Sequence, residues 1–329
     1  MGKWVLRSVA LLTFAGAATL LSAQPPRTPL PGTVNYVEGQ AAINGAPLAV
    51  KQDGNTQVQP NQNLTTANGK VEMLLSPGVF LREASNSDVR LISNGLANPS
   101  VEVVRGEALV EVDAKPHGAR IQVQEHGATA LIVKQGLYDF DSAGNRIAVL
   151  DGKIRVTEND RTKEFGKGHE LALDNPKLKT ESFDAKTAEN NDELYRWSSV
   201  RAGYLAEANQ ATAQNIYMGY NPWWGAGWYW DPYFAMWSWM PGDGWFYGPF
   251  GYPFFAPGYA IYAGGFYGGR YGFRGGYPAR FGVRGFAGNA YRAGVRGGAF
   301  RGGGFARGGF AGGGFHGGLG GGFHGGGRR

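Results

Sequence analysis

The 329-residue sequence contains no cysteine. Disulfide bonds, thiolate metal sites and cysteine nucleophiles are therefore excluded, and stability has to come from a packed core or from partners. Residues 258–329 contain no lysine, aspartate or glutamate, although they contain ten arginines. Residues 214–257 contain no lysine or arginine, and only Asp231 and Asp243 carry charge there. These absences divide the chain into regions of different composition.

The distribution of charge follows the same division. Residues 24–257 contain 20 basic and 26 acidic side chains, a net charge of −6, whereas residues 258–329 carry +10. The formal net charge of +6 for the whole chain hides this asymmetry. The sequence therefore predicts a mildly acidic body followed by a strongly basic tail.

Long apolar runs are scarce, and the clearest one is at the N-terminus. Lys3 and Arg7 precede an apolar stretch over residues 9–21, which ends at the small residues Ser22 and Ala23. This pattern is typical of a secretory signal peptide over residues 1–23, cleaved after Ala23. The run is shorter than the ~20 residues of a spanning helix, so no transmembrane helix is expected after cleavage. We expect an exported protein, in the periplasm or at the cell surface, that starts with a proline-rich lead-in over residues 24–31.

Motifs of catalysis are missing. The chain has no Gly-x-Ser-x-Gly elbow and no Gly-x-x-x-x-Gly-Lys phosphate loop, and no two of its five histidines have the spacing of metal ligands. His117 and His126 each precede a glycine and are predicted to lie in turns. Acidic residues at strand positions are interpreted as a solvated sheet face rather than an acid–base pair; they are Glu102, Glu107, Glu111 and Asp113. We expect no enzyme activity, no metal site and no cofactor.

Residues 32–175 show the alternation of apolar and polar side chains that half-buried strands have. Residues that accept the backbone angles of tight turns separate the runs. These signals are Asn44-Gly45, Asp53-Gly54, Asn68-Gly69, Asn94-Gly95 and Asp151-Gly152. The spacing predicts an all-β domain, either a β-sandwich or a stacked β-solenoid. About 140 residues bury enough surface to fold without disulfides.

The same region carries a resemblance to a known family. The stretches TVNYVEGQAAINGAPL, VEVVRGEALVEV and IAVLDGKIRVTENDRTKEFGKGHELAL resemble the FecR domain of bacterial envelope proteins. The resemblance implies a periplasmic β domain that relays receptor occupancy through a membrane helix to a cytoplasmic anti-sigma segment. This sequence shows neither of those two segments, and at residues 136–140 it reads GLYDF where many relatives have Gly-Thr before an aromatic. The relay function is therefore not carried over.

A helical connector is predicted over residues 183–213. Within it, the period of a helix places apolar side chains on one face, with Arg201 interrupting that face; they are Leu194, Trp197, Tyr204, Leu205 and Ala208. Asn190 is the expected N-cap, with Glu193 three positions later. We expect this helix to pack Trp197 and Tyr204 on the β domain or on the segment that follows.

Residues 214–257 form a segment rich in tryptophan, tyrosine and proline, with six prolines that forbid a continuous helix. Seven of the nine tryptophans lie here: Trp223, Trp224, Trp228, Trp230, Trp237, Trp239 and Trp245. Three interpretations remain open. The rings could pack an irregular stretch or short strands onto the β domain, form an interface for a membrane or a protein, or stack on the sugar rings of a glycan.

Residues 258–329 contain 30 glycines, and phenylalanine recurs every five residues from Phe300 to Phe315. Such a composition cannot bury enough surface to offset backbone entropy, so disorder in isolation is expected. Arginine beside glycine and phenylalanine also suits RNA, but the signal peptide argues against nucleic acid as a partner, since an exported chain meets little RNA. Candidate contacts with an envelope polyanion are Arg270, Arg274, Arg296, Arg301 and Arg307.

These observations favour a non-catalytic exported envelope protein that binds or tethers through its β domain, its aromatic segment and its basic tail. The partner would be an anionic polymer or polysaccharide, a membrane surface, or another copy of the tail. The main alternative is a carbohydrate-binding module with Trp223, Trp224, Trp228 and Trp230 as platforms. A remote alternative is a FecR-type signalling component that acts with separate membrane partners.

Overall fold

The structure is a computed structural model that describes residues 28–48, 54–173, 177–220 and 224–261. The expected signal peptide, half of the lead-in, Trp223 and the chain after Ile261 lie outside the described residues. Nearly all of the predicted basic tail, with its ten arginines, is therefore also outside them.

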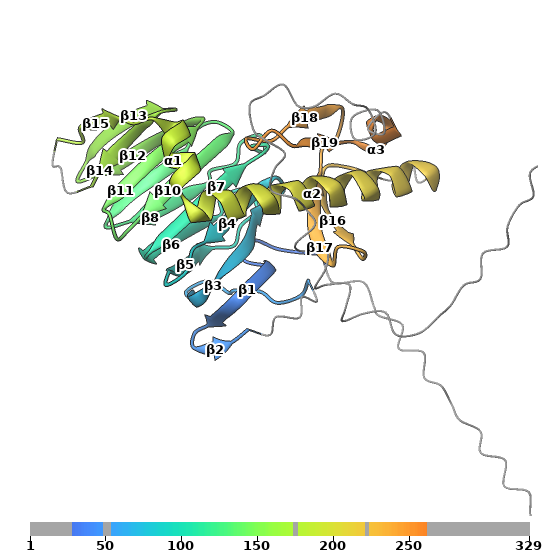
Figure 1. Ribbon diagram of the computed structural model, residues 1–329, viewed down its shortest axis with the longest axis horizontal. Coiled ribbons are helices and arrows are strands. Elements are labelled where there is room, and N and C mark those ends of the chain that lie inside the picture. The colour runs from blue at the N-terminus through green and yellow to red at the C-terminus, as the bar shows by residue number, and fades with distance from the viewer. Residues whose placement is uncertain (1–27, 49–53, 174–176, 221–223, 262–329) are drawn as a thin grey trace, which may run out of the picture. The chain divides into compact units, whose positions relative to one another are not determined.

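The described residues form strands up to Ser182, two consecutive helices, and then four short strands and a short helix (Figure 1). The first strands are β1 (Val34–Ile43), β2 (Ala46–Pro47), β3 (Asn63–Ser76), β4 (Val79–Glu83), β5 (Asp88–Ser93), β6 (Ser100–Arg105), β7 (Glu107–Val112) and β8 (Gln122–Glu125). They continue with β9 (Ala128–Ile132), β10 (Gly136–Asp141), β11 (Arg146–Asp151), β12 (Lys153–Glu158), β13 (Arg161–Gly166), β14 (His169–Ala172) and β15 (Thr180–Ser182). The remaining elements are α1 (Ala185–Asn191), α2 (Glu193–Met218), β16 (Gly227–Asp231), β17 (Met236–Met240), β18 (Trp245–Tyr247), β19 (Pro253–Phe255) and α3 (Pro257–Ala260).

The first fifteen strands belong to one sheet that curls back toward itself. Thirteen of them follow the order β13-β12-β9-β8-β6-β5-β3-β4-β7-β10-β11-β14-β15, with β1 paired to β3 and β2 paired to β1. A single residue, Gly152, joins β11 to β12, although these strands lie near opposite ends of that order. Lys167 and Gly168 join β13 to β14 across the same seam. Because such short connections can span only a few ångströms, the two ends of the sheet lie side by side and the sheet is nearly closed, like a barrel.

The inside of this curled sheet is the main hydrophobic core. Val71 and Met73 from β3, Val110 from β7 and Ile154 from β12 are all fully buried in it. These are side chains that the two-residue alternation predicts to share a buried face, and the structure confirms a mostly β body. The alternate side chains of β3 and β4 are buried as well, because a second layer covers the outer face there.

Tyr138 holds the seam closed from the inside. Its hydroxyl donates to the carbonyl of Lys134 at 2.5 Å and accepts from the backbone N–H of Lys153 at 3.0 Å, so it joins β10 to the start of β12. Gly152 has a φ of +94°, and a Cβ at this position would meet the Tyr138 hydroxyl and the carbonyl oxygen of Gln135. Glycine is required here for both reasons.

The predicted turn signals have mixed outcomes. Asn44-Gly45 forms the turn between β1 and β2 with positive φ at both residues, and His126 lies in the β8–β9 turn as predicted. The prediction of a turn at Asn68-Gly69 is wrong, because β3 runs straight through it. Gly69 lies opposite Gly39 of β1 beside a bulge, and a Cβ on Gly69 would meet the backbone of Gln40. These glycines serve the close approach of two strands rather than a chain reversal.

The helical part differs from the prediction at both ends. α1 precedes the long helix, and the N-cap of α2 is Asp192, whose carboxylate accepts from the backbone N–H of Tyr195 at 3.1 Å. The predicted N-cap, Asn190, is inside α1. α2 also continues to Met218, beyond the predicted end at residue 213, and its C-cap is Gly219, whose backbone N–H donates to the carbonyl of Asn215. No described helix is both long enough and apolar enough to span a lipid bilayer.

Candidate functional site

The aromatic segment forms two short hairpins, β16–β17 and β18–β19, that pack with α2 over the outer face of β3 and β4. Figure 1 shows α2 running past β4 and β7 toward these hairpins. Trp237 and Trp239 are buried in a cluster with Leu74 and Phe80 of the sheet and Leu205 of α2. Aromatic rings provide this cover because each one buries a large area.

The structure distributes the candidate tryptophans unequally. Trp237 and Trp239 are 5% and 4% exposed, so their faces are not available to a ligand. Trp228 is half-buried and meets the Phe80 ring edge to face, and Trp230 meets Trp237 in the same way. Trp224 is half-buried, and Trp223 lies outside the described residues.

Trp245 differs from these, since it is 44% exposed. Tyr247, two residues later on the same face of β18, is 43% exposed, and the two rings lie 5.3 Å apart, edge to face. Trp245 also stacks on Phe255 of β19. The exposed pair Trp245 and Tyr247 is called the aromatic ledge below. Tyr233, in the same segment, is 74% exposed and also faces solvent.

Side-chain amides attach the hairpins to the body. Asn35 of β1 donates to the carbonyl of Trp237 at 2.9 Å and accepts from its backbone N–H at 2.8 Å. Asn209 of α2 donates to the carbonyls of Trp239 and Phe255, and accepts from the Phe255 N–H at 2.8 Å. The Trp239 indole donates to Asp113 at 3.1 Å. Buried hydrogen bonds of this kind hold the second layer in one defined position, which apolar contacts alone would not do.

Beneath the layer lies a buried network of ionic side chains. The two oxygens of Glu72 accept from Arg201 of α2 at 2.8 Å and from Arg82 of β4 at 2.9 Å. Arg82 also pairs with Glu111 of β7 at 2.6 Å. The Arg201 guanidinium lies 4.0 Å from the centre of the Tyr36 ring. Arg201, which was expected only to interrupt the apolar helix face, is 4% exposed and links the helix to the sheet.

The interpretation of Glu111 and Asp113 as a solvated sheet face is wrong, because both are 1% exposed under the second layer. Burial and the neighbouring Glu111 raise the pKa of Asp113 well above its usual value. Burial alone would also raise the pKa of Glu72, but Arg201 and Arg82 hold it below its usual value. The network therefore places Glu72 between two arginines that stabilise its ionised form, with Asp113 beside it in surroundings that disfavour ionisation. No local pattern in the sequence signals it, since its partners are up to 129 residues apart.

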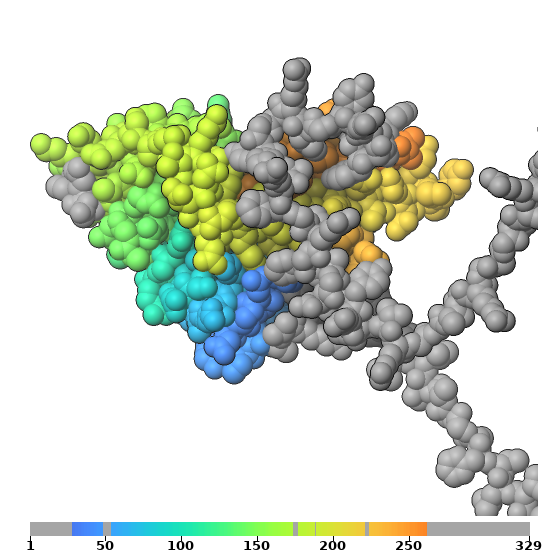
Figure 2. All heavy atoms as spheres, viewed as in Figure 1, coloured from blue at the N-terminus to red at the C-terminus, as the bar shows by residue number. Residues whose placement is uncertain are grey.

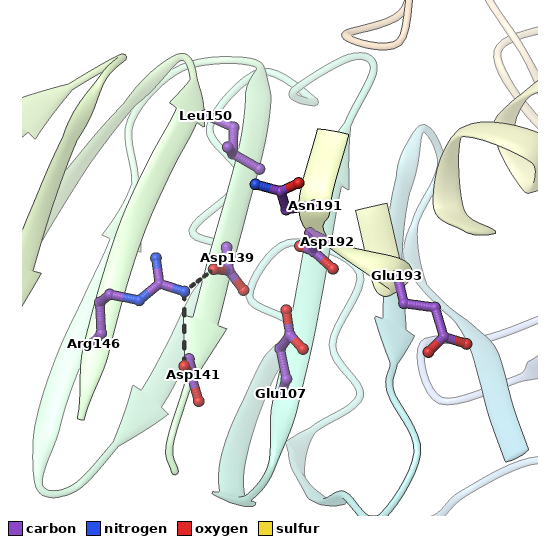
Figure 3. Close-up of a pocket in the computed structure, with 8 residues that line it drawn as sticks. All are labelled: Glu107, Asp139, Asp141, Arg146, Leu150, Asn191, Asp192 and Glu193. Carbon is purple, nitrogen blue, oxygen red and sulfur yellow. Dashed lines mark hydrogen bonds and ion pairs between the residues drawn. The ribbon is translucent and has the colours of Figure 1, made fainter. Parts of the chain in front are cut away.

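A second group of charged side chains lines a cavity at the junction of α1 and α2 with the sheet (Figure 3). Glu107, Asp139 and Asp141 contribute carboxylates, and Arg146 of β11 pairs with Asp139 at 2.8 Å. Among the described residues, no group of three or more histidine, aspartate and glutamate side chains is arranged to hold a metal ion. We call this cavity the acidic pocket, because most of its charged lining residues are carboxylates.

The C-terminal end of α2 presents apolar side chains to solvent, and Figure 2 shows this gold end of the helix at one edge of the body. Tyr217, Met218 and Tyr220 are 45%, 72% and 92% exposed, and Ile261, the last described residue, is 42% exposed. The candidate polyanion contacts from Arg270 to Arg307 lie outside the described residues.

Comparisons with known proteins give limited information. No family model matches the chain, and no curated protein matches it. Two crystal structures, at 1.65 Å and 2.50 Å resolution, of a Parabacteroides distasonis protein described as a "putative anti-sigma factor" are similar with a TM-score of 0.33. The sequence identities are 14% and 16%, and each match covers 38% of this chain and 62% of the other. The likeness is distant, and the resemblance to the FecR domain stays a prediction.

Proposed function

We propose that the protein is a non-catalytic exported envelope protein in which the described body is a rigid base and the basic tail provides the binding. One observation supports this most strongly, the separation of charge between residues 24–257, at −6, and residues 258–329, at +10. A tail with ten arginines and no acidic residue is suited to anionic lipid head groups or anionic envelope polymers. We further infer that the β body is a FecR-like domain, on the sequence motifs given above.

The packing of the body supports a structural role for the body and a binding role for the tail. Most of the described tryptophans hold the second layer on the sheet, so they are not available as a broad binding surface. The body therefore supplies a stable attachment point, and many weak contacts of the tail supply the affinity. If three arginines engage an anionic surface together, the gain is about 3 kcal/mol, or about two orders of magnitude in affinity.

The test is co-sedimentation of the mature chain with phosphatidylglycerol vesicles and with uncharged phosphatidylcholine vesicles. Replacing all ten tail arginines by glutamine should lower the bound fraction on phosphatidylglycerol to that on phosphatidylcholine. The matched variant with ten Arg→Lys substitutions keeps the charge and should bind about as well as the unmodified chain. Equal binding by the glutamine variant would refute electrostatic tethering by the tail.

A second candidate function, glycan binding, rests on the aromatic ledge. Trp245 and Tyr247 expose adjacent rings on one face of β18, and indole and phenol rings stack on sugars. Pull-down with insoluble cell-wall glycan at high salt would separate it from tethering. Loss of retention in Trp245→Ala but not in Trp224→Ala would favour the ledge, and no retention of the unmodified chain would exclude it.

A further inference from the structure

The acidic pocket has a defined shape and position. It occupies about 410 Å³ where β7, β10 and β11 meet the junction between α1 and α2. Its lining residues are Glu107, Asp139, Asp141, Arg146, Leu150, Asn191, Asp192 and Glu193. Figure 3 shows the carboxylates of Glu107, Asp139 and Asp192 turned toward one open space, whereas Glu193 points away from it.

Negative charge exceeds positive charge in the pocket. Arg146 is the one cation among the lining residues, and it is already engaged with Asp139 and, through its other terminal nitrogen, with Glu170 at 3.4 Å. Glu193 pairs with Lys70 at 2.7 Å. Among the described residues, no hydrogen bond or ion pair involves the carboxylate of Glu107.

One carboxylate oxygen of Asp139 lacks a hydrogen-bond donor among the described residues. Its side chain is 5% exposed, and its Oδ2 pairs with Arg146. Its Oδ1 is buried at the cavity and has no hydrogen-bond partner among the described residues. A buried carboxylate oxygen without a donor is costly, so a donor from outside the described residues would be favourable here.

The pKa values of two carboxyl groups in the pocket also indicate that a cation would be favourable there. Burial and the nearby carboxylates of Asp139, Asp192 and Asp141 raise the pKa of Glu107 to about 9. Burial, together with Asp192 and Asp141 and against the opposing effect of Arg146, raises the pKa of Asp139 to about 7. An additional cation between these two groups would favour their ionised forms.

We propose that the acidic pocket binds a guanidinium group from the arginine-rich segment 262–329 of its own chain. A guanidinium has several N–H donors in one plane and can donate to more than one carboxylate oxygen. The acceptors offered by the pocket are Asp139 Oδ1 and the Glu107 carboxylate. The segment holds ten arginines and no acidic residue, so its charge is complementary to the pocket. Linkage within one chain raises its effective concentration above that of any free segment. This inference is independent of vesicle binding, which can fail while docking holds.

The test uses the full mature chain. Because the chain has no cysteine, Asn191→Cys places a single nitroxide label at the rim of the pocket. Arginine labelled with ¹⁵N then reports paramagnetic relaxation at the side-chain Nε–H groups of residues 262–329. We expect strong broadening of one or more of these signals. Its absence would overturn the proposal.

Substitutions in the pocket test its specificity. Glu107→Gln with Asp139→Asn should reduce the docked population about tenfold, because two charge-assisted hydrogen bonds are lost. The matched control, Glu158→Gln with Asp160→Asn, removes two carboxylates at the β12–β13 turn and should leave the broadening unchanged. Glu107→Gln alone, which breaks no hydrogen bond or ion pair of the described residues, serves if the double variant does not fold, and it should also weaken the broadening.

Two further outcomes would count against the proposal. Equal broadening in the pocket variants and the control variant would mean that the segment associates through general charge rather than through this pocket. Broadening that appears only when a nitroxide-labelled copy is mixed with a separate ¹⁵N-labelled copy would mean that the occupant comes from a second molecule, which would overturn docking within one chain.

Discussion

Replacing Arg201 by methionine tests whether the buried ionic network attaches α2 and the aromatic hairpins to the sheet. The substitution removes the guanidinium that donates to Glu72 Oε1 at 2.8 Å and lies over the Tyr36 ring, while methionine retains most of the apolar stem. Breaking a buried ion pair costs about 3–5 kcal/mol. The lower end applies, because Glu72 keeps its hydrogen bonds with Arg82 and Asn35.

We therefore expect the free energy of unfolding to fall by about 3 kcal/mol, which corresponds to a decrease in Tm of about 6–12 °C for a body of this size. Urea titration followed by tryptophan fluorescence measures the change, since the indoles of the second layer become exposed. Arg196→Met, on the exposed side of the same helix, is the control and should change stability by less than about 0.5 kcal/mol. A loss at Arg201 no larger than at Arg196 would refute the reasoning.

Three further predictions test separate parts of the structure. Burial, with Asp139 and Asp141 nearby, raises the pKa of Glu125 to about 8. Between pH 4 and pH 8 the folded state therefore binds a proton that the unfolded state does not. The stability that Glu125 contributes is complete near pH 4 and is lost as the pH rises through 8. In urea titrations, Glu125→Gln should reduce the loss of unfolding free energy between pH 4 and pH 8 by about 2 kcal/mol, even if the pKa of Glu125 is raised by only half as much. A loss as steep as in the unmodified chain would contradict this. Gly152→Ala should lower Tm much more than Gly127→Ala does, because Gly127 also has a positive φ but has open space around it. Equal decreases in Tm would mean that the close packing of Gly152 at the seam does not matter for stability. Trp237→Ala should cost about 3–5 kcal/mol and Trp245→Ala less than about 1 kcal/mol by the same titration, whereas similar costs would mean that Trp245 is also structural.

The sequence predicted the β body because its signal is local. Alternate apolar residues such as Val71 and Met73 share the inner face whatever lies elsewhere in the chain. The Asn44-Gly45 turn depends only on two adjacent backbone conformations. The identical logic was wrong for Asn68-Gly69, because the partner of Gly69 is Gly39, thirty residues away, and only the pairing of β1 with β3 shows why glycine is there.

The second layer could not be predicted for a related reason. Glu111 and Asp113 alternate with inward-facing valines, so they were assigned to solvent, and nothing near them shows that Trp239 covers them. Arg201 likewise interrupts an apolar helix face, and its reason is Glu72, on a different element. For the candidate site, the sequence identified the tryptophan segment, but it could not distinguish buried rings from the exposed aromatic ledge. The acidic pocket, formed by three strands and a helix junction, had no signal in the sequence.

The most direct test of the account is the salt dependence of retention in isolated envelopes of the producing cell. The full mature chain and a chain that ends at Ile261 would be washed from these envelopes at increasing ionic strength. The account predicts that the full chain is retained at low salt and released as screening weakens its arginine contacts, while the shorter chain is released at every salt concentration. Retention of the shorter chain equal to that of the full chain would contradict it.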